Sequence, residues 1–172
     1  MDKVIPRGTI EDRRIGNGED LSPEGFAALS GLDWLRGLLD GRYAPPPFSV
    51  IADVEPLSVE KGRIVFAGTP ASRFYNPMGI VHGGWMGLLL DTAMACSVHS
   101  ALPAGKAYAT LEMKIVFVRA VREDSGPLTA EGNLLHIGSR TASAEGKIYD
   151  SKRRLVAHGS ETCMIWDVRD RS

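Results

Sequence analysis

The stretch FYNPMGIVHGGWMGLLLDTAMACSV, residues 74–98, places one carboxylate, Asp91, in an otherwise apolar run whose helical part starts at a His-Gly-Gly triplet. From residue 83 to residue 98 apolar side chains occupy every side of a helix, which is typical of a fully buried helix. The run is shorter than the about 20 residues of a membrane span, and an Asp at the centre of a span is unfavourable. We therefore expect a buried core helix and no membrane span.

The segments around this run predict one α+β domain. A helix is expected from Ser22 to Gly41, because Ser22 and Pro23 favour a helix start and an apolar stripe follows at helical spacing. Residues 48–70 are interpreted as two strands around a Lys61-Gly62 turn. From residue 108 onward, period-two alternation predicts a long strand, followed by three more strands with turns near residues 136–139 and 150–152. Short turns between successive strands favour a largely antiparallel sheet with one face on the apolar helix.

Within the long strand, the alternation assigns Leu111, Met113, Ile115 and Phe117 to one face of the sheet. Thr110, Glu112 and Lys114 fall on the other face, because successive side chains of a strand point to opposite sides.

The composition argues against several classes of partner. The 172 residues are 44% hydrophobic and 24% charged, with a formal net charge of -1. Because this leaves little positive charge to hold a phosphate backbone, we expect no nucleic-acid partner. Cys96 and Cys163 lie in apolar runs without metal-site spacing, which predicts packed thiols in a reducing cytoplasm. The N-terminus has no apolar signal segment, and we expect a flexible segment over residues 1–20 and a single domain over residues 21–172.

Asp91 needs a compensating environment, because burying an unpaired carboxylate costs free energy. Two interpretations are open at this point. Either Asp91 pairs locally with a backbone amide or an Arg, or it faces a ligand-binding cleft. Gly84, Gly87 and Ala95 on its side of the helix are small enough for a ligand or another backbone to approach closely.

The N-terminal end of this helix is a second candidate feature. Gly83 and Gly84 would leave backbone N–H groups accessible at the positive end of the helix dipole, as in an oxyanion hole, although close packing also explains two glycines. His82 is interpreted as a capping or packing residue rather than a metal ligand, since no second ligand lies at suitable spacing. We expect no metal site.

The spacing between the two features has a consequence for assembly. Gly83 and Asp91 are eight residues apart on one helix, or about 12 Å at 1.5 Å per residue. One helix therefore cannot bring its amide and its carboxylate to the same acyl carbon. If both act on one group, the carboxylate must come from a second copy, which predicts a homodimer with composite sites.

Residues 44–166 resemble the hotdog-fold acyl-CoA thioesterases, in particular the PaaI-type branch related to phenylacetate degradation and to 4-hydroxybenzoyl-CoA thioesterase. The most specific part of the resemblance is NPMGIVHGGWMGLLLDTA, which combines Asn76, the His-Gly-Gly triplet and an acid nine residues after His82. The resemblance implies a hotdog fold, an antiparallel sheet of five to six strands wrapped around a long central helix, in dimers that often pair into tetramers. The helix predicted at residues 22–41 is an addition to that pattern.

The resemblance also implies roles for individual residues. Asp91 would be the general base or nucleophile, Asn76 would hold the attacking water or the substrate, and the Gly83 amide would polarise the carbonyl oxygen. Thr110 would place a hydroxyl near the attacking water, or would be an ordinary sheet threonine. Further candidates for substrate binding are His82, Gly84, Trp85, Gly138, Ser139, Arg140, Arg119 and Arg122. For each of these arginines a solvated surface charge is an open alternative.

The activity implied by this resemblance is hydrolysis of an aryl- or medium-chain acyl-CoA to the free acid and coenzyme A, without a metal or redox cofactor. Coenzyme A would be part of the substrate. Two alternatives share the fold: a hydratase or dehydratase, and a non-catalytic module that binds or senses acyl-CoA. Trp85, directly after the triplet, would either narrow the acyl pocket or pack in the core.

Overall fold

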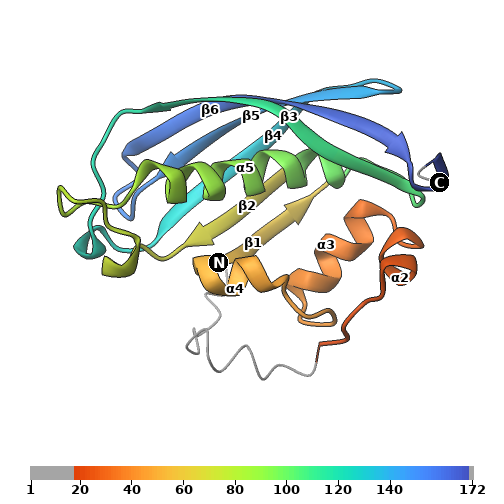
Figure 1. Ribbon diagram of the computed structural model, residues 1–172, viewed down its shortest axis with the longest axis horizontal. Helices are drawn as coiled ribbons and strands as arrows, with labels where there is room; N and C mark the ends of the chain where they lie inside the picture. Colours follow the sequence, from red (N-terminus) through yellow and green to blue (C-terminus); the bar gives the residue numbers. More distant parts are fainter. Residues whose placement is uncertain (1–17, 171–172) are drawn as a thin grey trace.

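The computed structural model describes residues 18–170, in which one six-stranded antiparallel sheet curves around a long helix (Figure 1). The strand order across the sheet is β1-β2-β4-β5-β6-β3. The strands are β1 (Val54–Glu60), β2 (Arg63–Gly68), β3 (Lys106–Phe117), β4 (Leu128–Ile137), β5 (Thr141–Tyr149) and β6 (Leu155–Asp167). The hotdog arrangement expected from the sequence is confirmed, with strands 1 and 3 at the two edges.

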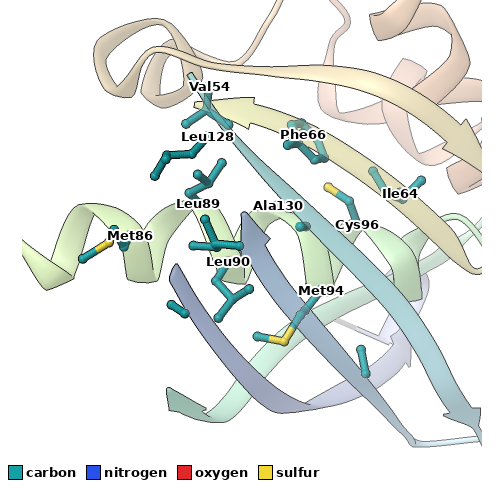
Figure 2. Close-up of a cluster of buried hydrophobic side chains, with 14 of the residues drawn as sticks. Val54, Ile64, Phe66, Met86, Leu89, Leu90, Met94, Cys96, Leu128 and Ala130 are labelled. Carbon is teal, nitrogen blue, oxygen red and sulfur yellow. The ribbon is translucent and has the colours of Figure 1, made fainter. Parts of the chain in front are cut away.

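The central helix α5 (Gly83–His99) lies along the concave face of this sheet (Figure 1). Leu89, Leu90 and Met94 are fully buried and belong to the cluster of core side chains between helix and sheet (Figure 2). The helix approaches β4 so closely that a Cβ at Gly132 would overlap the Ala93 carbonyl oxygen. The prediction of a helix buried in the core is confirmed. Within residues 18–170 no helix has the length and apolarity required to cross a membrane.

The N-terminal part differs from the single helix predicted for residues 22–41. Two helices form, α2 (Pro23–Ala27) and α3 (Gly31–Leu39), and the expected N-cap Ser22 begins the first of them. Ser30 caps the second helix by accepting a hydrogen bond from the Asp33 amide at 3.2 Å. Gly31 packs so tightly on His99 of α5 that a Cβ would overlap it, and its amide donates to Leu102. This tertiary contact interrupts the helix, which local periodicity does not encode.

A second difference is α4 (Pro47–Ala52), where the sequence predicted the beginning of a strand. Pro47 occupies the first helical turn, a position that tolerates proline because its missing N–H would have no intrahelical partner. The helix ends at Asp53, whose φ of 54° is left-handed, and β1 follows directly. The helices α2, α3 and α4 therefore form an extra layer beside β1 and α5 (Figure 1).

Two further predictions concern the N-terminal segment and the cysteine thiols. Most of the segment expected to be flexible, residues 1–17, lies outside the described residues, whereas Glu19 pairs with the backbone at Arg42 and Ala44. Cys96 and Cys163 are both buried free thiols, as predicted.

Candidate active site

The carboxylate that the sequence singled out lies near the middle of α5 and faces β3. Asp91 is half-buried, and its Oδ1 accepts a hydrogen bond from the Thr110 hydroxyl at 3.0 Å. Two side chains that the sequence nominated separately are therefore in direct contact within one chain. Asp91 thus pairs locally, but with a neutral hydroxyl rather than with the backbone amide or Arg suggested by the sequence, and it also lines a pocket.

A β-bulge in β3 brings Thr110 to this position. Thr110 pairs with Cys163 and Glu112 pairs with Thr162, so Leu111 is an extra residue in the ladder. A bulge changes which side chains share a face of the strand. Below it, Ile115 and Phe117 approach α5 at Gly87 and Gly83, on the same side as Thr110. The predicted alternation, which put Thr110 opposite Ile115 and Phe117, is therefore wrong across the bulge.

A second carboxylate, which the sequence reasoning missed, lies behind this pair. Glu161 of β6 is only 3% exposed, and its Oε1 lies within hydrogen-bond distance of the Thr110 hydroxyl oxygen, at 3.1 Å. Its strand alternates, and Ala157, Glu161 and Cys163 all occupy the buried phase. An acid in the apolar phase of a strand is the signal that could have revealed it.

The electrostatics of Glu161 follow from its burial. Loss of hydration raises the pKa of Glu161, and the nearby Asp91 charge acts in the same direction, whereas hydrogen bonds from Cys163 and Thr110 lower it. The resulting pKa is about 7. The Cys163 thiol donates to Glu161 Oε1 at 2.8 Å. Within residues 18–170, the buried Oε2 atom has no hydrogen-bond partner. Below about pH 7 such a site favours the neutral carboxyl.

At the N-terminus of α5 the two glycine amides are in different states: one is capped and the other is available. His82 is the N-cap, and its Nδ1 accepts from the Gly84 amide at 2.8 Å. Within residues 18–170 the Gly83 amide has no hydrogen-bond acceptor, and the Phe117 ring lies next to it. The amide that the sequence assigned to an oxyanion is thus the one left available, while His82 performs the capping role.

The loop before α5 is organised by Asn76. Its Oδ1 accepts from the Met78 amide at 2.9 Å and, more weakly, from the Ile80 amide at 3.5 Å. Arg122 also joins this loop, because its guanidinium donates to the Gly79 carbonyl at 3.1 Å. Asn76 therefore lies in the loop that precedes the N-terminus of α5, away from Asp91 of the same chain.

Trp85 lies in the core rather than at an open site. Its indole N–H donates to the Ala52 carbonyl at 2.8 Å, and its ring stacks on Phe74 at 5.1 Å. The side chain is buried and ties α5 to α4. Of the two interpretations open from the sequence, this geometry corresponds to packing.

The remaining substrate-binding candidates form two groups at opposite ends of the sheet. Gly138, Ser139 and Arg140 form the exposed turn between β4 and β5, near the C-terminal end of α5. Arg119 and Arg122 follow the other end of β3, beside the N-terminus of α5. Since β3 has 12 residues, these two groups are separated by roughly 35 Å along the sheet. One chain does not bring them together.

A pocket of about 400 Å³ opens at Asp91 and Thr110 and extends under the N-terminal helices. Its far part is aromatic: Phe26 and Trp34 meet edge to face at 5.2 Å, and Trp34 stacks on His99 at 5.5 Å. Burial lowers the pKa of His99 to about 4, so this ring is neutral at physiological pH. The pocket is thus lined by a carboxylate and a hydroxyl at one end and by apolar side chains at the other, and its volume suits a small ligand.

This arrangement can perform proton transfer or nucleophilic attack next to an apolar group. A half-buried carboxylate held by a hydroxyl is oriented, and its free oxygen can take a proton from water or attack a carbonyl. The Gly83 amide at the dipole end of α5 can stabilise a developing negative charge. Within residues 18–170 no group of His, Cys, Asp and Glu side chains is arranged to hold a metal ion.

Comparison with known proteins agrees with this chemistry. A model of the thioesterase superfamily matches residues 78–157. A protein of Saccharolobus solfataricus, named for a proposed esterase activity, is 31% identical over 108 residues, which are 61% of this chain and 73% of that relative. A 1,4-dihydroxy-2-naphthoyl-CoA hydrolase of Listeria monocytogenes is 27% identical over 103 residues, 60% of this chain and 82% of the relative.

Among solved structures, the fold is similar to that of a protein of Ralstonia eutropha JMP134 named for a proposed thioesterase activity and a relation to phenylacetic acid degradation. The TM-score is 0.69 and the identity 26%, with 76% of this chain and 98% of that chain covered. The additional helices α2 and α3 lie before residue 44, where the sequence resemblance to the hotdog thioesterases begins.

Proposed function

The chain belongs to the thioesterase superfamily and is a thioester hydrolase, and we propose that it hydrolyses an aryl- or medium-chain acyl-CoA to the free acid and coenzyme A. The observation that carries this proposal is the Asp91 carboxylate, held by Thr110 at the mouth of an apolar pocket. Family membership supports thioester hydrolysis, and the pocket supports an acyl group that is apolar.

In the proposed reaction Asp91 acts on the thioester carbonyl in one of two ways. As a general base it takes a proton from water while the water oxygen bonds to the carbonyl carbon. As a nucleophile its own oxygen forms that bond, and water then opens the resulting anhydride. In both cases the carbon–sulfur bond breaks, and the coenzyme A thiolate leaves and is protonated. Neither route calls for a metal or redox cofactor, and we propose that turnover survives treatment with a chelator.

The aromatic part of the pocket supports the choice of acyl group. Phe26, Trp34 and Tyr108 surround the space beyond Asp91, and aromatic side chains favour flat apolar ligands by stacking and edge contacts. The Listeria relative is named for an aryl-CoA substrate. Phe26 of α2 and Trp34 of α3 line the pocket, so we propose that this layer limits the length of the acyl group.

The oxyanion donor is proposed to come from a second copy of the chain. Gly83 and Asp91 lie on one helix, about 12 Å apart. Strand β3 is a 12-residue edge strand with exposed apolar side chains, including Leu111 at 59% and Phe117 at 48%, and such an edge favours pairing with another strand. Antiparallel pairing of two β3 strands would set two α5 helices side by side in opposite directions.

If the two-fold axis passes near Gly87, midway between the two residues, each Gly83 amide lies level with the partner subunit's Asp91. The same operation would bring the arginines after one β3 strand toward the 138–140 turn of the other. We therefore propose a homodimer with composite sites, in which Arg119, Arg122 and Arg140 contribute to binding the coenzyme A phosphates. Pairing of such dimers into tetramers is a further expectation of the family resemblance.

The test is release of free thiol from a panel of short, medium, long and aromatic acyl-CoAs, with Asp91→Asn measured alongside. We expect turnover of at least one aryl or medium-chain substrate and a loss of about 10²-fold or more in kcat for Asp91→Asn, with little change in substrate binding. Asp40→Asn, an exposed acid at the end of α3, is the matched control and should be unchanged.

Two results would contradict the proposal. Equal turnover by wild type and Asp91→Asn would remove Asp91 from the chemistry. Tight acyl-CoA binding without any thiol release would instead favour a non-catalytic binding module. In a single turnover in ¹⁸O-labelled water, labelled oxygen on Asp91 identifies the nucleophilic route, with water attacking the Asp91 carbon of the anhydride, because the general-base route puts the label only on the free acid.

A further inference from the structure

Glu161 is a buried acid that the proposed reaction does not use. It lies on the face of β6 that points toward α5, and across the sheet it pairs with Met113 of β3 and Ala144 of β5. It does not line the pocket that holds Asp91 and Thr110. Glu161 is therefore not placed to touch substrate in that pocket. It reaches the site through Thr110, and it also interacts directly with the Asp91 side chain.

The Thr110 hydroxyl stands between two carboxyl groups. Its oxygen is 3.0 Å from Asp91 Oδ1 and 3.1 Å from Glu161 Oε1. A hydroxyl has one hydrogen to donate and lone pairs with which to accept. It can therefore satisfy two ionised carboxylates only one at a time, but it can accept from a carboxylic acid on one side while it donates to a carboxylate on the other.

We infer that Glu161 is a positioning residue, which in its protonated form donates to the Thr110 oxygen and so directs the Thr110 hydrogen to Asp91. This inference rests on the proposed function, because its consequence for catalysis assumes that Asp91 acts on the thioester. The Cys163 thiol, which donates to the same Glu161 oxygen at 2.8 Å, holds the carboxyl group in place from the other side.

The groups around Glu161 favour its neutral form. Burial raises the pKa of Glu161 to about 7, with Asp91 of α5 acting in the same direction. Burial also raises the pKa of Cys96 on α5 to about 12 and raises that of Tyr108 on β3 well above its ordinary value. These two groups are neutral at physiological pH and supply no compensating charge.

Cys163 behaves in the same way, because burial and the adjacent Glu161 raise the pKa of its thiol. From β5 the residue opposite is Ala144, which carries no charge. Asp91 is thus the charged group that Glu161 meets from α5, and the effect of a second negative charge beside it is repulsive.

Ionisation of Glu161 should therefore weaken the site. Above about pH 7 the acid loses the proton with which it holds Thr110, and the single hydroxyl hydrogen is divided between two carboxylates. The added charge also opposes the oxyanion that develops on the thioester carbonyl. Both effects lower kcat as the pH rises, whereas substrate binding in the pocket is affected less.

The test compares kcat and KM of wild type, Glu161→Gln and Glu161→Ala between pH 5.5 and 9. Gln imitates the protonated acid, since its amide can donate to Thr110 and carries no charge. We expect wild-type kcat to fall about 10-fold through a transition near pH 7. The kcat of Glu161→Gln should stay within about 3-fold of the wild-type maximum and show no such transition. Glu161→Ala should lose about 10-fold in kcat at every pH, with KM changed less than about 3-fold. A Glu161→Gln variant that keeps the wild-type transition would overturn the inference.

A second measurement does not depend on turnover. In protein labelled with ¹³C at glutamate carboxyl groups, the resonance missing from Glu161→Gln identifies Glu161, and its titration midpoint should be about 7 and lower in Asp91→Asn. A midpoint near the ordinary 4.5 would overturn the inference. If no acyl-CoA is cleaved, the proposed function fails, yet this titration still decides whether Glu161 holds a proton beside Thr110.

Discussion

The Thr110 hydroxyl lies 3.0 Å from Asp91 Oδ1, although the two residues are 19 positions apart and belong to different elements. This hydrogen bond joins the central helix to the edge strand of the sheet. It holds one oxygen of a carboxylate that lines the pocket, which is the arrangement that the proposed hydrolysis requires.

Two substitutions of Thr110 distinguish the contribution of its hydroxyl group to activity from that of its side-chain shape. Thr110→Val removes the donor to Asp91 while keeping a β-branched side chain, and we expect kcat to fall about 10- to 100-fold, the range for a lost hydrogen bond to a charged group. Thr110→Ser restores the hydroxyl and should stay within about 3-fold of wild type. Steady-state thiol-release kinetics on the three proteins check this, and equal activity of the Val and Ser variants would show that the hydroxyl is dispensable.

Glu161 should also make stability depend on pH. Its pKa is about 7 in the folded protein and near 4.5 when unfolded, so between these values the folded state binds more protons and stability falls as the pH rises. The Glu161→Gln variant does not lose stability in this way, because its amide does not ionise. Its free energy of unfolding relative to wild type should therefore increase by on the order of 3 kcal/mol from pH 4.5 to pH 7.5.

Urea denaturation at several pH values measures this difference. His99 has the opposite effect in the overlapping window, because burial lowers its pKa to about 4 and stability is lost as the pH falls below about 6.5. His99 is present in both proteins, so its contribution cancels in the comparison. A difference that stays constant with pH would mean that Glu161 is ionised throughout.

The close contact between α5 and β4 predicts a sharp stability effect. Gly132→Ala would drive a methyl group into the Ala93 carbonyl, and we expect a loss of about 3 kcal/mol or more, at or above the upper end of typical overpacking costs. Gly25→Ala in α2 is the control, because its Cβ would meet only ordinary contacts at 3.5 Å or more and alanine favours a helix. Thermal unfolding of both variants checks the prediction, which an unchanged Tm for Gly132→Ala would contradict.

The proposed dimer predicts different behaviour at the two edges of the sheet. Leu111 lies at the bulge of β3 and Leu57 at the bulge of β1, and both are exposed. Lysine on an edge strand opposes pairing with another strand. In sedimentation velocity, wild type and Leu57→Lys should have at least twice the 18.6 kDa chain mass, and Leu111→Lys should be shifted toward the monomer. A wild-type monomer would refute composite sites.

Local sequence patterns predicted the parts of the fold that depend on short-range periodicity. The apolar run at residues 83–98 became α5, and the period-two segments became strands of one antiparallel sheet. The single helix expected at residues 22–41 was wrong, because Gly31 packs on His99 and a second helix starts there at Ser30. The strand expected at Phe48 was wrong too, since Pro47 begins a short helix.

For the site, the sequence by itself determined the carboxylate, the glycine amides and their spacing along one helix, because helical rise and residue type are local properties. Only the tertiary structure decided which side chains meet Asp91. Thr110 reaches it because a bulge at Leu111 changes the faces of β3, and Glu161 reaches Thr110 because β6 pairs with β3 in that register. Strand register is set by long-range pairing, and a shift of one residue exchanges every side chain between the two faces.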